Sequence, residues 1–93
     1  MRVEHTLEAV ARLVHRADRD RYEVRVRCNR VLPVEDILKA VAEANAKPLY
    51  QEAFTQMLSR LLAAEVETVG WHSGVTTRVV CGGESSSFGG NVP

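Results

Sequence analysis

Apolar residues along the chain recur with two different periods, and each period predicts its own type of secondary structure. Between residues 22 and 28 they alternate with Glu23, Arg25 and Arg27, as in a strand with one buried and one solvated face. Earlier in the chain they recur at intervals of three and four, which predicts an amphipathic helix over about residues 4–16. The apolar positions of this first helix are Val3, Leu7, Val10, Ala11 and Val14.

Two further helices are predicted in the middle of the chain. One begins after Pro33, a residue suited to the first turn of a helix, and ends near Asn45. The third helix, about 48–64, has an apolar face that covers about half of its circumference. So wide a face predicts that this helix contacts two neighbouring elements and forms the centre of the core.

The C-terminal part of the chain has the pattern of a β-hairpin followed by a tail. Residues 65–71 and 75–81 are rich in β-branched side chains, and a Ser-Gly pair at 73–74 supplies the glycine that a tight turn favours. Residues 82–93 are mostly glycine and serine and predict a flexible tail. Phe88 in this tail is either without an anchor or docks in a neighbour's groove.

These elements predict an α+β domain over residues 1–81 with the order α-β-α-α-β-β. Three helices would pack on one face of a small, mostly antiparallel, three-stranded sheet, and the other face would carry Glu23, Arg25 and Arg27. Such a sheet has two unpaired edges, which natural proteins protect or use for association. We therefore expect at least one edge to pair with another subunit.

Length and composition support a small globular protein that gains from association. The chain has 93 residues, of which 45% are hydrophobic, so it forms one domain with a thin core. A partner's surface would supply the burial that a thin core lacks. No apolar run approaches the roughly 18–20 residues of a membrane span, and no secretory signal is apparent. We therefore expect a cytoplasmic protein with no membrane partner.

Charge is distributed unevenly along the chain, although the formal net charge is zero. Eight of the ten arginines lie in the first thirty residues against five acidic residues, so that segment has a net charge of +3. The other residues have a net charge of −3. One part of the molecule therefore suits anions and the other suits cations, which indicates a contact surface without identifying the partner.

The candidate binding surface consists of arginines on the predicted strand and just before it. Several guanidinium groups on one face neutralise phosphates and release counterions, so a nucleic-acid-binding module is one interpretation. A solvated face is the other, because three acidic residues are interleaved and few aromatic residues are present for base stacking. An RNA-binding KH domain is excluded, because the link between the predicted helices has no GxxG motif. The candidates are Arg16, Arg19, Arg21, Arg25 and Arg27.

Residue spacing gives little support to metal binding or nucleophilic catalysis. The three histidines and two cysteines are scattered, with no CxxC, HxH or HExxH motif, so no metal or cofactor is expected. Cys28 and Cys81 fall on apolar positions of predicted strands, where a cysteine is usually an inert core residue. No GxSxG motif is present to make Ser73 a nucleophile beside His72. The sequence therefore identifies no catalytic residue.

Trp71 and His72, next to the predicted hairpin turn, form a second candidate site. An aromatic ring and an imidazole beside a tight turn suit the rim of a ligand pocket or an interface, where tryptophan is a frequent anchor. Packing of Trp71 on the third helix is the structural alternative.

Residues 1–9 (MRVEHTLEA) and 22–26 (YEVRV) resemble the pterin-synthase chains of the tunnelling fold. That family also places paired helices before a closing hairpin, and it assembles its strands into multimeric barrels. Its zinc histidines are not matched, because Ala11, Asp18 and Asp20 stand roughly at those positions. Its substrate-anchoring glutamate has no clear match near Trp71. The resemblance implies a shortened, metal-free relative, and we do not assign the chain to that family from the sequence.

The sequence thus favours a small non-catalytic binding or structural subunit that acts by homo-oligomerisation or by docking in a larger assembly. A nucleic-acid-binding module that uses the N-terminal arginines is the first alternative. A small-molecule enzyme with a pocket between subunits is the second, and it would place His72 or Cys28 near a cavity in the oligomer.

Overall fold

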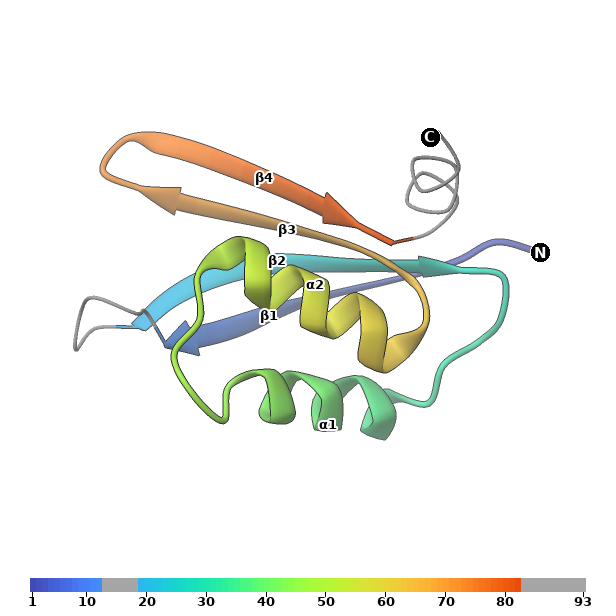
Figure 1. Cartoon of the computed structure of the whole chain (residues 1–93). Helices are drawn as coiled ribbons and strands as arrows, with labels where there is room; N and C mark the ends of the chain where they lie inside the picture. The colour runs from blue at the N-terminus through green and yellow to red at the C-terminus, as the bar shows by residue number, and fades with distance from the viewer. Residues whose placement is uncertain (13–18, 83–93) are drawn as a thin grey trace, which may run out of the picture.

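The computed structural model describes residues 1–12 and 19–82, and these form four strands and two helices (Figure 1). The α+β class is as predicted, but the prediction of three helices on a three-stranded sheet is wrong. The predicted tail lies outside the described residues except for Gly82. The elements are β1 (Val3–Arg12), β2 (Arg19–Cys28), α1 (Val34–Ala44), α2 (Gln51–Leu62), β3 (Glu65–His72) and β4 (Val75–Cys81).

The segment predicted as the first helix forms strand β1 instead. Ala9 and Ala11 are buried while Val10 between them is 40% exposed, which is the alternation of a strand. The same apolar residues fit helical spacing as well, because short apolar runs fit either period. The segment forms a strand because it pairs antiparallel with β2 over ten residues. The sequence gives no direct sign of that long-range pairing.

The other predicted elements are confirmed with small changes in their bounds. α2 is shorter at both ends than predicted, and α1, β3 and β4 lie where the patterns placed them. α2 is followed by Ala63, whose backbone is left-handed with φ 51°. Arg30 donates hydrogen bonds to the carbonyl oxygens of Leu62 (2.7 Å) and Ala63 (3.5 Å). A cation there satisfies orphaned carbonyls and suits the negative end of the helix dipole.

All strands pair antiparallel in the order β1-β2-β3-β4. Both helices lie on one side of this sheet, and α2 packs on β3 and β4 (Figure 1). The other side, which we call the open face, is covered by no helix or strand of the described residues. The molecule therefore has two layers and one sheet face left for solvent or a partner.

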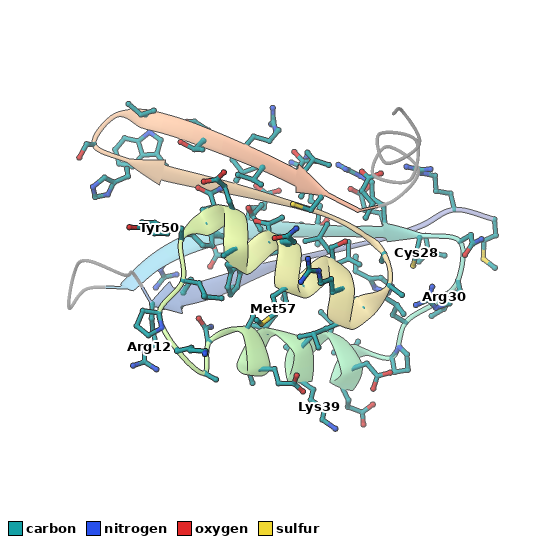
Figure 2. All side chains as sticks on the ribbon, viewed as in Figure 1. Arg12, Cys28, Arg30, Lys39, Tyr50 and Met57 are labelled. Carbon is teal, nitrogen blue, oxygen red and sulfur yellow. The ribbon has the colours of Figure 1, made fainter. Side chains whose placement is uncertain are left out.

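The core lies between α2 and the two central strands. Val24, Val26 and Val66 of the sheet and Leu58 of α2 are fully buried. The rings of Tyr22 and Phe54 pack in a tilted pair with centroids 5.5 Å apart. In Figure 2, Met57 lies between the two helices, where it is packed against this core.

A small polar network is enclosed under the first turns of α2. The hydroxyl groups of Thr55 and Thr68 are 2.6 Å apart, and Gln51 donates to the Thr68 hydroxyl at 3.1 Å. Gln51 also donates to the carbonyl oxygen of Thr77 at 3.0 Å, which joins α2 to β4. No buried side-chain polar atom of the described residues lacks a hydrogen-bond partner. This network fixes how α2 sits on the sheet.

Candidate functional site on the open face and edges of the sheet

The register of the strands decides which side chains share the open face. Arg27 lies opposite Glu4 of β1 and Glu65 of β3, and Arg25 lies opposite Glu67. Because opposed residues of antiparallel strands point to the same side, these side chains all face away from the helices. Arg27 therefore meets carboxylates from both neighbouring strands.

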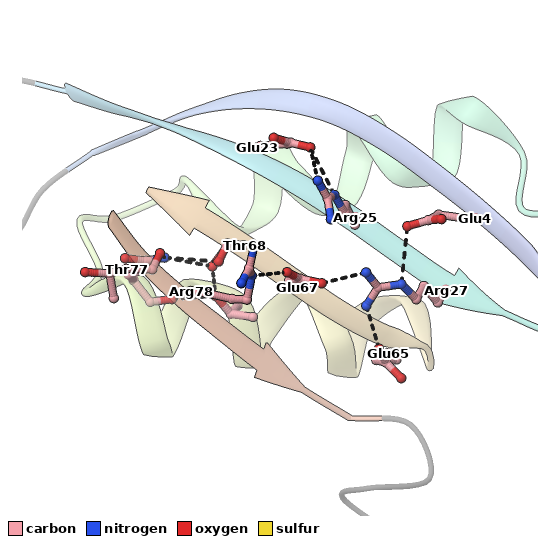
Figure 3. Close-up of polar contacts among 11 residues, drawn as sticks. Glu4, Glu23, Arg25, Arg27, Glu65, Glu67, Thr68, Thr77 and Arg78 are labelled. Carbon is pink, nitrogen blue, oxygen red and sulfur yellow. Dashed lines mark hydrogen bonds and ion pairs between the residues drawn. The ribbon is translucent and has the colours of Figure 1, made fainter. Parts of the chain in front are cut away.

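What we call the ion-pair chain crosses all four strands and consists of Glu4, Arg27, Glu65, Glu67 and Arg78 (Figure 3). Arg27 contacts Glu65 at 2.7 Å and Glu67 at 2.6 Å, and its Nε donates to Glu4 at 3.2 Å. The second carboxylate oxygen of Glu67 accepts from Arg78 of β4 at 2.5 Å. Such charge-assisted bonds are the strong ones in proteins. The chain thus ties the sheet together from its first strand to its last.

Burial and charge compete at the centre of this chain. The side chain of Glu67 is 6% exposed, and this burial by itself raises the pKa of its carboxyl group. The hydrogen bonds and charges of Arg27 and Arg78 outweigh burial and hold the pKa of Glu67 below its usual value. The hydrogen bonds to Glu65 and Glu67 also raise the pKa of Arg27. Both shifts favour the charged forms of Arg27 and Glu67 at neutral pH.

The structure places the other predicted arginines as follows. Arg21 contacts Glu8 at 3.2 Å, and Arg25 contacts Glu23 at 2.9 Å. Arg16 lies outside the described residues, and only the backbone of Arg19 is described, in β2. Arg21, Arg25 and Arg27 are thus brought to one face, but each of them contacts a carboxylate of the same chain. A phosphate at this surface would compete with these acids.

Trp71 and His72 lie on opposite faces at the end of β3. Trp71 is 65% exposed and shares the open face with Glu67, whereas His72 is exposed on the helix side. In Figure 1 the β3–β4 turn extends beyond α2. The structural alternative, in which Trp71 packs on the third helix, therefore does not hold within one chain, because Trp71 lies on the open face and is exposed.

The outer edge of β1 is covered at one end by the loop after α1. Asn45 donates to the carbonyl oxygen of Val10 at 2.8 Å and accepts from the N–H of Arg12 at 3.4 Å. The backbone groups of even-numbered residues of β1 therefore point away from β2. Those of Glu4, Thr6 and Glu8 point the same way.

No strand of the described residues pairs with the outer edge of β4. Ser73 and Gly74 both have positive φ, 52° and 81°, as in a two-residue hairpin turn, so His72 and Val75 form the hydrogen-bonded closing pair. By alternation, the backbone groups of the even-numbered residues of β4 point away from β3. These residues are Thr76, Arg78 and Val80.

β4 is also poorly covered on its faces. Val75 is 61% exposed on the helix side, and Val80 is 48% exposed on the open face. Exposed edge strands of this kind are the usual sites of strand addition.

None of the residues considered for chemistry lines the groove between the two helices. A groove of about 280 Å³ between α1 and α2 is lined by Arg30, Asp36, Lys39 and Glu43 among others, but by neither His72 nor Cys28. Cys28 donates to the carbonyl oxygen of Arg30 at 2.9 Å, and burial raises the pKa of the Cys81 thiol. No group of three potential metal ligands occurs in the described part of the chain. No helix described here is long and apolar enough to cross a membrane.

The comparisons with known proteins rest on fold. No protein-family model matches the sequence, and no curated protein matches it either. The structure is similar to the crystal structure of the archaeosine synthase QueF-like in the apo form, with a TM-score of 0.72. The similarity covers 86% of this chain and 90% of that chain, at 20% sequence identity. The two chains share a fold.

The acidic residues of the ion-pair chain did not emerge as site residues from the sequence. Glu65 and Glu67 alternate with the buried Val66 just as Arg25 and Arg27 alternate with Val26. This alternation is visible in the sequence, and complementary charges at matching positions of two strands favour pairing. The sequence does not fix the register of the strands, so it does not show which acid lies opposite which arginine.

Proposed function

We propose that the protein is a small binding or structural subunit that acts as a homo-oligomer, assembled through the two free edges of its sheet. The observation that carries this proposal is β4, which pairs with β3 on one side only in the described sheet and has Val75 and Val80 exposed on its two faces. An edge strand that meets no partner is an aggregation hazard, which natural proteins cover or use. β1 offers a second edge at the other side of the sheet.

Charge and fold support the same proposal. Three arginines of the N-terminal segment, Arg21, Arg25 and Arg27, contact acids of the same chain, so a phosphate on the open face would have to compete with these carboxylates. The alternative is nucleic-acid binding through these arginines. It requires each arginine to break its contact with a carboxylate and to contact a phosphate instead. Self-association requires only that the free edges meet.

The decisive measurement is the solution mass of two variants of one residue. Val80→Pro removes the N–H that points outward from β4, whereas Val80→Ala keeps it and only trims the side chain. We expect the parent and Val80→Ala to be oligomers by light scattering, and Val80→Pro to be a folded monomer by circular dichroism and light scattering. A monomeric parent at high protein concentration would overturn the proposal.

A small-molecule enzyme with a pocket between subunits is the second candidate, and the similarity to the archaeosine synthase QueF-like structure favours it. That protein is a synthase by name, and the fold alone is shared at 20% identity. In this candidate His72 would line a cavity that exists only in the oligomer. Binding of a nucleobase or nucleoside by the parent but not by Val80→Pro would support it, and equal binding by both would contradict it.

A further inference from the structure

The groove between α1 and α2 has an apolar floor and a rim whose charges cancel. Leu61 of α2 is 43% exposed and lines this groove together with three buried apolar residues. These three are Leu32, Ala40 and Leu62. The rim carries two cations and two anions, from Arg30, Lys39, Asp36 and Glu43. A groove of this kind suits an uncharged segment that bears one large apolar side chain.

We propose that the occupant is the chain's own C-terminal segment, residues 83–93, with the ring of Phe88 against Leu61. Phe88 is the one aromatic residue of this segment. Residues 85–93 have no charged side chain, which matches a rim of zero net charge. The inference goes beyond the proposed function, because it uses neither free edge of the sheet.

Gly82 fixes the place where this segment leaves the described fold. A Cβ at this position would overlap with the Ser59 hydroxyl group and would lie 2.7 Å from the carbonyl oxygen of Ala64. The φ of Gly82 is 84°, in the left-handed region. Glycine is the residue that accepts both the close approach and this backbone conformation. The segment therefore starts against the last turn of α2, beside Ser59.

Three consecutive residues of α2 mark a path from that point to the groove. Successive residues of a helix are rotated by about 100°, so Ser59, Arg60 and Leu61 point to one flank, the outer side and the other flank. Ser59 lies beside Gly82, Arg60 is exposed, and Leu61 lines the groove. In Figure 1, α2 lies between β4 and α1. The path therefore crosses the outer side of α2 near its C-terminal end.

The length and the charge of the segment fit this path. Phe88 follows Gly82 by six residues, which span up to about 20 Å when extended, whereas a helix with its side chains is about 10–12 Å wide. Glu84 is the one charged residue of the segment and comes two residues after Gly82. On a path over α2 it passes Arg60, which has the opposite charge. Three serines then lead to Phe88.

The covalent link favours this occupant over a separate peptide. A short linker holds its end at an effective concentration in the millimolar range. One aromatic side chain on a shallow apolar floor is a weak contact for a free peptide. The same contact is populated when the side chain belongs to the chain that forms the groove.

A tryptophan in place of Phe88 tests whether the ring lies in the groove. In a Trp71→Phe background, Phe88→Trp gives the chain a single tryptophan. We expect its emission at shorter wavelength than in the urea-unfolded chain, and its quenching by acrylamide several-fold weaker. Leu61→Glu puts a charge on the floor of the groove and should abolish both differences. The matched control is Leu38→Glu, at a leucine that is 56% exposed on α1 and lies outside the lining of the groove, and it should preserve them.

Two results of this experiment would overturn the proposal. One is fully solvated emission from the Phe88→Trp variant in the folded chain. The other is an equal response to Leu61→Glu and Leu38→Glu, which would show that the ring does not lie in this groove. Circular dichroism of each variant verifies that the chain is folded.

Cross-linking shows whose groove the segment occupies. In a Cys28→Ala/Cys81→Ala background, Leu61→Cys and Phe88→Cys are combined in one chain. We expect a disulfide within the chain, seen as a monomer that migrates faster on a gel without reductant. Covalent multimers would instead put the segment in the groove of another copy and overturn docking within the chain. Absence of any disulfide would contradict contact between residue 88 and residue 61.

Discussion

The two hairpins of the sheet differ in how far their own chain covers them. In β1–β2, Ala9, Ala11 and Tyr22 are at most 3% exposed, and the loop after α1 bonds to the end of β1. In β3–β4, Trp71 and Val75 at the tip are 65% and 61% exposed. The apolar side chains named in β1–β2 are thus buried, whereas those at the tip of β3–β4 are exposed to solvent. The first hairpin serves the stability of the single chain, and in our proposal the second serves association.

The largest expected change in the free energy of unfolding comes from truncating a side chain in the buried core. Leu58→Ala removes a fully buried side chain between α2 and the sheet and should lower the free energy of unfolding by about 3 kcal/mol. Val75→Ala, the matched change at the exposed tip, should lower it by less than about 0.5 kcal/mol in the monomeric Val80→Pro background. Urea unfolding followed by circular dichroism measures both. Equal losses for the two variants would remove the distinction between the buried core and the exposed tip of β3–β4.

A smaller loss is expected from the ion-pair chain that links the hairpins. Glu67→Gln removes a 6% exposed carboxylate from Arg27 and Arg78 and should cost about 2 kcal/mol at pH 7. Glu23→Gln, at the more exposed Arg25 pair, should cost less than about 0.5 kcal/mol. Unfolding titrations of both variants and the parent provide the comparison.

The pH dependence of the same Glu67→Gln variant gives an independent check. Because the pKa of Glu67 is lowered in the fold, its stabilisation is complete above the unfolded pKa of about 4.3 and is lost as pH falls through the lower folded value. The neutral amide of the variant has no proton to gain in this range. The gap in stability between parent and Glu67→Gln should therefore narrow in acid below about pH 4.3. A gap that is constant with pH would show that Glu67 acts by packing alone.

The smallest expected effect on folding is at the open tip. Trp71 is the one tryptophan of the chain and is 65% exposed, so Trp71→Ala should change the free energy of unfolding by less than about 0.5 kcal/mol. If the tip lies near the joint between copies, the fluorescence of Trp71 should lie at shorter wavelength in the oligomer than in the Val80→Pro monomer. Identical spectra for oligomer and monomer would place Trp71 outside the interface.

The sequence predicted the elements whose patterns are local. The stripe of α2, the Ser73-Gly74 turn and the alternation of β2 each depend on residues close in the chain, and all three are confirmed. β1 was mistaken for a helix because Val3, Leu7 and Val10 fit a helical period as well as a strand. Because this strand was not predicted, the prediction also lacked one edge strand of the sheet and the contact between Arg27 and Glu4.

The sequence by itself determined the α+β class, the two helices, the closing hairpin and the common face of Arg25 and Arg27, because backbone periodicity acts over a few residues. Tertiary structure alone decided that residues 3–12 form a strand, that the sheet has four strands, and that the clustered arginines meet carboxylates of β1 and β3. Register is a relation between distant segments, set by which side chains match across strands. For that reason three arginines of the +3 segment, which suggests phosphate when read along the chain, face carboxylates of the same chain in the fold.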